Sequence, residues 1–166
     1  MVMIIKQLKK QLRELKMNEV KIVNYNPEWE NIYKKYKKKI LKTEKRVYHV
    51  GSASAKIKGR KEIDILLISD DIPKTYETMA KMGFTKGPIE EYEAHMRNRY
   101  YGVRCDLHIF KPNHKQVKTY LEQSKKLQNN PEIREKYIKL KEECDGVSIE
   151  EYRKKKKEFW KNIRKI

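Results

Sequence analysis

The feature that most constrains the fold of this chain is a short segment in which acidic and apolar residues alternate at the start of an apolar run. Residues 51–68 read GSASAKIKGRKEIDILLI, so a Gly-Ser pair precedes Glu62-Ile63-Asp64 by nine residues. Alternate residues of a β-strand point to the same face of a sheet. The segment therefore predicts a strand on which Glu62 and Asp64 project side by side while Ile63 turns into the core.

This carboxylate pair predicts a site for a divalent cation and a phosphate. Two adjacent carboxylates raise each other's pKa unless a cation lies between them, and Mg²⁺ is commonly held by one or two carboxylates together with phosphate oxygens. The turn ahead of the pair offers backbone N–H groups and hydroxyls to a phosphate, through Gly51, Ser52 and Ser54. The following loop adds three cations that either contact phosphate or are simply solvated: Lys56, Lys58 and Arg60.

A third carboxylate is expected on a later strand. In residues 99–110, RYYGVRCDLHIF, apolar residues alternate with Arg104, Asp106 and His108, which is the period of a half-buried strand. If this strand lies beside the first, Asp106 joins Glu62 and Asp64 as a triad that ligates Mg²⁺ or Mn²⁺, since two-metal sites need more ligands than one pair supplies. The alternative metal site combines His49, Asp64 and His108, because neutral imidazoles suit transition metals.

These motifs resemble the polymerase-β-like nucleotidyltransferase superfamily, and in overall plan its GrpB branch. The matching segments are YNPEW at 25–29, HVGSAS at 49–54, IDI at 63–65, LHI at 107–109, and the spaced Arg134, Tyr137, Leu140 and Lys141. The catalytic segments 58–64 and 102–106 are also similar to those of archaeal-type CCA-adding enzymes. The chain differs from the usual GrpB pattern in carrying Glu62 and Asp106, where GrpB members tend to have an apolar residue and no acid; this difference favours retained catalysis.

The resemblance implies an enzyme that transfers a nucleoside monophosphate from a nucleoside triphosphate, with ATP as the leading candidate, to a hydroxyl acceptor in RNA, protein or a small molecule. Pyrophosphate is then released, Glu62, Asp64 and Asp106 carry the reaction with magnesium, and the Gly51 turn holds the phosphates. Two alternatives remain open. One is a catalytically degenerate GrpB-like module that binds nucleic acid or acts as an adaptor, and the other is a metal-dependent phosphohydrolase.

The charge balance favours a phosphate-rich partner. Lys and Arg number 41 against 23 Asp and Glu, which gives a formal net charge of +18, and such a field attracts RNA, nucleotides and other polyanions. One basic run lies beside two aromatic residues near the end of the chain and is a candidate polyanion contact: Arg153, Lys154, Lys155, Lys156 and Lys157. Only two cysteines occur, without metal-site spacing, and no apolar run spans a bilayer, so we expect a cytoplasmic protein.

The pattern of the whole chain predicts one α/β domain of the α+β type, in which helices flank a mixed, nucleotidyltransferase-like sheet. We expect residues 1–19 to form an amphipathic N-terminal helix with Ile5, Leu8, Leu12 and Leu15 on one face. Residues 20–110 form the catalytic sheet core, with helices opening at Pro27 and after Asp71 and a hairpin near Gly102. Residues 111–166 form helices that open near Pro112, Pro131 and Ser148.

Overall fold

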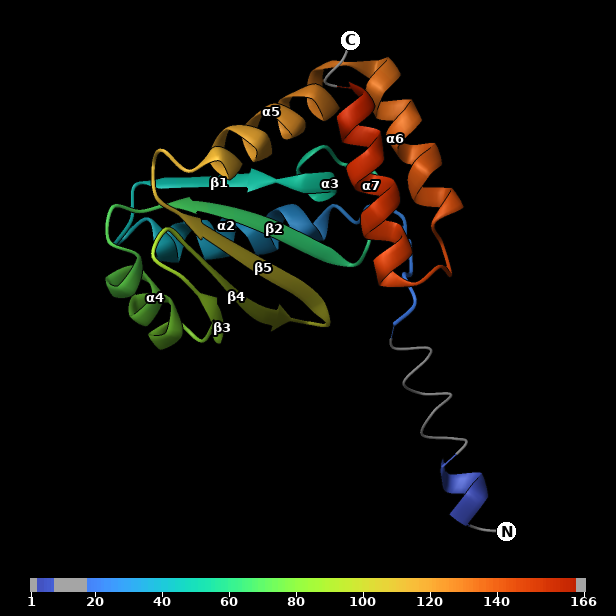
Figure 1. Cartoon of the computed structure of the whole chain (residues 1–166). Helices are drawn as coiled ribbons and strands as arrows, with labels where there is room; N and C mark the ends of the chain where they lie inside the picture. The colour runs from blue at the N-terminus through green and yellow to red at the C-terminus, as the bar shows by residue number, and fades with distance from the viewer. Residues whose placement is uncertain (1–2, 8–17, 164–166) are drawn as a thin grey trace.

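The computed structural model describes residues 3–7 and 18–163. Its centre is a five-stranded mixed sheet of strand order β1-β2-β5-β4-β3, flanked by helices as Figure 1 shows. The strands are β1 (Arg46–Val50), β2 (Glu62–Ile68), β3 (Thr85–Ile89), β4 (Glu93–Tyr100) and β5 (Val103–Phe110). The helices are α2 (Glu28–Ile40), α3 (Gly51–Ser54), α4 (Ile72–Lys81), α5 (Lys115–Asn129), α6 (Pro131–Glu143) and α7 (Ile149–Ile163). The predicted α+β class, a mixed sheet followed by a helical C-terminal third, is confirmed.

The two acid-bearing strands are neighbours. β2 pairs with β5 in parallel, with Asp64 opposite Asp106 and Glu62 opposite Arg104. All other pairs in the sheet are antiparallel: β1 with β2, β5 with β4, and β4 with β3. The register therefore places the three carboxylates on one face of the sheet, within two adjacent strands.

The opposite face of the sheet carries the main core. Ile63, Ile65 and Leu67 of β2 pack there against α2 and α4, in a cluster that includes Trp29 and Met79. Because side chains alternate along a strand, burial of this face leaves the acids on the other. That face is covered by α5 at one end, where Leu66, Ile68 and Phe110 meet Val117.

The C-terminal helices complete the acid-bearing side. Leu127 of α5, Tyr137 of α6 and Trp160 of α7 form a separate apolar cluster with Ala55 and Ile57, which follow α3. In Figure 1, α7 and α6 stand beside α3 and the end at which β2 begins. Through this cluster, α7 lies beside the start of β2, where Glu62 is located. The two elements are more than eighty residues apart in the sequence.

Several helix starts follow their predicted signals. The side chains of Asp71 and Asn130 accept hydrogen bonds from Lys74 N (3.0 Å) and Ile133 N (3.0 Å), and Ser148 Oγ accepts from Glu151 N (3.1 Å). These contacts satisfy N–H groups that have no partner within the helix. The start of α5 differs from its prediction: the helix begins at Lys115 and His114 is its cap, because residues 112–113 form a turn.

The predicted N-terminal helix is described only in part. Residues 3–7 are helical, whereas Leu8, Leu12 and Leu15 lie outside the described residues. Among the helices that the structure describes, none has the length and apolar character needed to cross a bilayer.

Candidate active site

Three carboxylates and one guanidinium form the centre of the site. Glu62 and Asp64 project from β2 and Asp106 from β5, with side chains between 14% and 22% exposed. Arg104 lies between two of them: its Nη2 pairs with Glu62 Oε2 and lies 3.0 Å from Asp106 Oδ2. The predicted triad is therefore assembled on one face, but two of its members already share a half-buried cation.

Further arginines hold the same two acids. Arg97 of β4 donates from Nε to Asp106 Oδ1 at 2.8 Å, and Arg60 Nη1 lies 3.7 Å from Glu62 Oε2. Arg104 Nε is buried and has no hydrogen-bond partner among the described residues. A buried donor without a partner costs free energy, so Arg104 has unused capacity for an anionic ligand.

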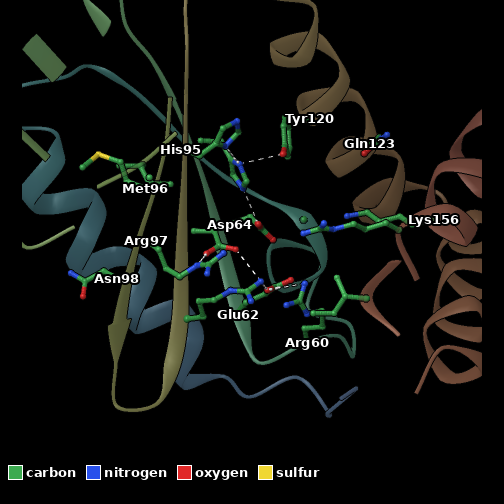
Figure 2. A pocket seen from close by; sticks show the side chains of 18 of the residues that line it. Arg60, Glu62, Asp64, His95, Met96, Arg97, Asn98, Tyr120, Gln123 and Lys156 are labelled. Carbon is green, nitrogen blue, oxygen red and sulfur yellow. Dashed lines mark hydrogen bonds and ion pairs between the residues drawn. The ribbon is translucent and has the colours of Figure 1, made fainter. Parts of the chain in front are cut away.

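A cleft of about 930 Å³ opens over these residues. Figure 2 shows Glu62 and Asp64 on the sheet, with Tyr120 and Gln123 of α5 above them and Lys156 of α7 to one side. Among the described residues, the carboxylates that line the cleft are those of Glu62, Asp64 and Asp106. Seven cations also line it: Arg60, Lys86, Arg97, Arg99, Arg104, Arg153 and Lys156. The cleft therefore has an excess of positive charge and suits an anionic ligand better than a cationic one.

Asp64 has a different partner from the other two acids. Since a carboxylate only accepts hydrogen bonds, His108 donates from Nε2 to Asp64 Oδ1 at 3.0 Å. Nδ1 of His108 also lies within hydrogen-bond distance of His95 Nδ1 (3.1 Å) and Tyr120 Oη (3.3 Å). This chain of contacts fixes the orientation of the Asp64 carboxylate.

The electrostatic surroundings keep Asp64 ionised. Burial raises the pKa of Asp64, but the hydrogen bond and charge of His108, with Lys156 and Lys141, more than offset burial and lower the pKa below its ordinary value. The pKa of Lys156 is shifted in the opposite direction, above its ordinary value. Tyr137 raises the pKa of Lys156 more than burial lowers it, with help from Asp64, so Lys156 stays cationic at neutral pH.

Gly51 brings main chain close to Asp64. Its φ is +75°, and a Cβ at this position would lie 2.6 Å from Asp64 Oδ2. Gly51 N donates to Ser124 Oγ of α5 at 3.2 Å. Glycine therefore lets the first turn of α3 approach the carboxylate at the floor of the cleft.

The other predicted phosphate contacts lie elsewhere. Ser54 Oγ donates to Gly51 O at 2.7 Å, and Ser52 packs against Gly59. Lys58 pairs with Glu142 at 2.5 Å, and Lys56 is exposed. Of the predicted phosphate-binding residues, Gly51 and Arg60 line the cleft, and these four do not.

His49 does not join Asp64 and His108. It lies opposite Ile65 in the β1–β2 register, so it faces α2 on the other side of the sheet. There it stacks on Tyr33, with ring centroids 4.2 Å apart, and its Nδ1 lies 3.4 Å from Glu30 Oε2. The alternative metal site of His49, Asp64 and His108 is therefore not assembled, because adjacent strand positions point to opposite faces.

The basic run on α7 divides between two environments. Arg153 and Lys156 line the cleft, and Figure 2 shows Lys156 directed toward Asp64. Lys154 and Lys157 are exposed, and Lys155 pairs with Glu151 at 3.3 Å. A helical spacing of three places residues 153 and 156 on one face, which is the signal that could have separated them from the other three.

The fit of the site to a divalent cation depends on the arginines. Carboxylate oxygens are the donors that Mg²⁺ prefers, and the triad supplies three such groups. Among the described residues, however, no group of three or more His, Cys, Asp or Glu side chains already has the arrangement of a metal site. The carboxylate oxygens are therefore the right type of ligand for Mg²⁺. They become available to it when Arg104 and Arg97 leave the acids and bind another anion.

Some site residues were missed in the sequence. Arg97, Arg104 and Tyr120 contact the acids or His108, and Lys141 is buried with Nζ donating to Tyr152 Oη at 2.6 Å. Arg104 had a usable signal, because it precedes Asp106 by two residues and shares its strand face. Arg97 and Tyr120 had none, since their positions depend on strand pairing and helix packing.

Comparisons with known proteins agree with this fold. The family model described as GrpB protein matches residues 19–165. The UPF0157 protein VC_A0354 of Vibrio cholerae is 27% identical over 154 residues, which cover 89% of this chain and 81% of that protein. A crystal structure of the conserved protein GrpB from Enterococcus faecalis superposes with a TM-score of 0.67 at 24% identity, covering 86% of this chain and 98% of that one.

A more distant structural match is a cytoplasmic RNA terminal U-transferase, with a TM-score of 0.47 and 13% identity, over 67% of this chain and 37% of that one. At that score the likeness carries no functional argument. The family assignment depends on the match of residues 19–165, which covers most of the sequence. This chain belongs to the GrpB family.

Proposed function

We propose that the cleft binds a nucleoside triphosphate and transfers its nucleoside monophosphate to a hydroxyl acceptor. The observation that carries the proposal is the placement of Glu62, Asp64 and Asp106 on one sheet face, under a cleft whose other charged side chains are cations. In the reaction, the acceptor oxygen bonds to the α-phosphorus, the bond from that phosphorus to the bridging oxygen breaks, and pyrophosphate leaves. The acceptor proton passes to solvent or to a carboxylate of the triad.

The cations of the cleft bind the phosphates. Lys156 and Arg153 approach from α7, and Arg97 and Arg104 exchange their carboxylate partners for phosphate oxygens, to which guanidinium groups bind through two parallel hydrogen bonds. Arg104 enters this exchange with one donor already unpartnered. His108 holds Asp64 in place throughout.

The exchange releases the acids for magnesium. Glu62, Asp64 and Asp106 would hold Mg²⁺ or Mn²⁺, which when bound neutralises phosphate charge and lowers the pKa of an acceptor hydroxyl. Asp106 pairs with both Arg97 and Arg104, so it loses both of these partners when they turn to the phosphates.

Calorimetry with the four ribonucleoside triphosphates, in Mg²⁺ and in EDTA, tests the proposal. We expect one triphosphate or more to bind in Mg²⁺ and at least tenfold more weakly in EDTA. Asp64→Asn and Asp106→Asn remove metal-ligand charge and should abolish the effect of Mg²⁺. Asp70→Asn is the matched control, because Asp70 pairs with Arg46 far from the cleft and is 81% exposed. Absence of metal-dependent binding in the wild type would reject the nucleotidyl-transfer proposal.

The arginine bridge favours a second candidate, a non-catalytic module that binds a phosphorylated ligand without metal. Arg104 occupies the position between Glu62 and Asp106 that a cation would otherwise neutralise. This candidate predicts triphosphate binding that EDTA leaves unchanged and that Arg104→Met weakens. Pyrophosphate release in the presence of an acceptor would exclude it.

A further inference from the structure

We infer that a second groove, on the other side of the sheet, binds single-stranded nucleic acid. The groove lies between α2 and the β4–β5 hairpin and has a volume of about 430 Å³. It is separate from the acid-bearing cleft, since it adjoins the α2 face of the sheet, which is the face of the main core.

The charge of the groove has a single sign. Five of its ten lining residues are cations and none is acidic: Lys35, Lys38, Lys39, Lys42 and Arg99. In the part of the chain that the structure describes, the only α2 lysine with an ion-pair partner is Lys34, which lies 3.9 Å from Glu30. Lysines gathered without carboxylates match the repeated charge of a phosphodiester backbone.

Aromatic side chains border these cations. Lys35 Nζ lies 2.9 Å from Tyr100 Oη, and Tyr100 meets the ring of Tyr101 edge-on, with centroids 4.6 Å apart. Tyr101 is 86% exposed. An exposed ring beside a line of cations is the combination on which unpaired bases stack while their phosphates are neutralised.

The backbone of the hairpin adds an independent observation. Tyr101 and Gly102 both have positive φ, 48° and 75°, as a two-residue turn of the I′ type requires. Asn, Asp or Gly would relieve the strain at position 101, whereas a large ring there is unfavourable. A strained tyrosine whose ring packs outward, into solvent, is better explained by a ligand than by stability.

The groove and the acid-bearing cleft lie on opposite faces of the sheet and adjoin each other near the end of β4. Asn98 and Arg99, near the end of β4, line both. A strand bound along α2 can therefore pass Arg99 and present its end to the acids. That placement of the end rests on the proposed function, whereas binding in the groove does not.

The test uses fluorescence anisotropy of the intact chain with labelled twelve-residue oligouridylate and oligodeoxythymidylate. Lys35→Gln/Lys38→Gln/Lys39→Gln should weaken binding at least tenfold at about 0.1 M salt, and should reduce the slope of log K against log salt by about 2, because each lost phosphate contact in a single strand contributes about 0.7. Lys115→Gln/Lys118→Gln/Lys125→Gln is the matched control. It removes the same charge from exposed positions of α5 on the opposite side of the sheet and should change binding by less than threefold.

Tyr101→Asn tests the stacking role without straining the turn. We expect it to weaken binding at least fivefold while the urea midpoint stays or rises, and Tyr92→Asn, at the far end of β4 and 52% exposed, to leave binding unchanged. Equal losses in the two lysine triples would show attraction by net charge alone and overturn the proposal. So would absence of binding in the wild type, or a duplex of the same sequence binding as tightly as the single strand.

The oligonucleotide result is separable from that of the acid-bearing cleft. Triphosphate calorimetry on the lysine triple of α2 should match the wild type, because those lysines do not line the cleft. Loss of triphosphate binding in Asp64→Asn with oligonucleotide binding intact would support both sites independently. Tighter binding of the RNA than of the DNA probe would name RNA as the ligand, and equal binding would leave the class as single-stranded nucleic acid.

Discussion

Gly51 shows how one residue type sets the geometry of the site. Two separate features exclude a side chain at this position. Its φ is positive, and a Cβ there would lie only 2.6 Å from Asp64 Oδ2. We expect Gly51→Ala to lower the free energy of unfolding by about 2 kcal/mol or more, since the left-handed conformation alone costs about 1–2 kcal/mol. Gly146→Ala is the control, because Gly146 has φ +83° and a Cβ added there would meet no atom within 4 Å. Equal losses in urea unfolding would show that contact with Asp64 adds nothing.

His49 makes stability sensitive to acid. Burial lowers the pKa of His49 despite Glu30, which raises it, and its Nε2 has no hydrogen-bond partner among the described residues. The unfolded chain, with a histidine pKa of about 6.5, therefore binds the proton first, and stability present above about pH 6.5 is lost as pH falls below it. His49→Phe keeps the stacking on Tyr33 and should flatten the fall in urea midpoint between about pH 7.5 and pH 5. An unchanged slope would assign the acid sensitivity elsewhere, for example to His95, whose pKa burial also lowers.

At the scale of elements, α6 and α7 are joined by a buried ammonium. Lys141 is 3% exposed, donates to Tyr152 Oη at 2.6 Å and lies within 5.2 Å of the centroids of Tyr137 and Tyr152. Tyr152→Phe removes the acceptor of a buried charge and should cost about 1–3 kcal/mol in chemical unfolding. Adding Lys141→Met removes the charge as well, so the double variant should recover most of that loss. A double variant no more stable than Tyr152→Phe alone would show that the ammonium is satisfied in another way.

At the scale of the whole molecule, the net charge of +18 acts on folding and on binding in opposite directions. Self-repulsion destabilises the compact state, and salt shortens the range of that repulsion from about 30 Å at 0.01 M to less than 10 Å at 0.5 M. We expect the urea midpoint to rise over this range of NaCl while oligonucleotide affinity falls. Lys115→Glu/Lys118→Glu/Lys125→Glu reverses three charges and should reduce the rise in midpoint. A midpoint that falls with salt would indicate that favourable ion pairs outweigh the repulsion.

Much of the fold could be predicted because its signals are local. The cap residues before α4, α6 and α7 and the alternation of β2 and β5 each depend on neighbours within a few residues. The start of α5 was wrong by about one turn, because Pro112-Asn113 is equally compatible with a turn. The N-terminal helix beyond residue 7 stays a prediction.

The sequence by itself determined which residues share a strand face, and so the grouping of Glu62 with Asp64 and of Arg104 with Asp106. Only the tertiary structure decided which partner each acid has. Strand alternation has a period of two residues wherever the strand lies, but pairing Arg97 with Asp106 depends on the β4–β5 register, and bringing Lys156 to Asp64 depends on how α7 packs. The same reason placed His49 on the opposite face and gathered the lysines of α2 beside Tyr100, because contacts between distant residues are set by packing and not by spacing along the chain.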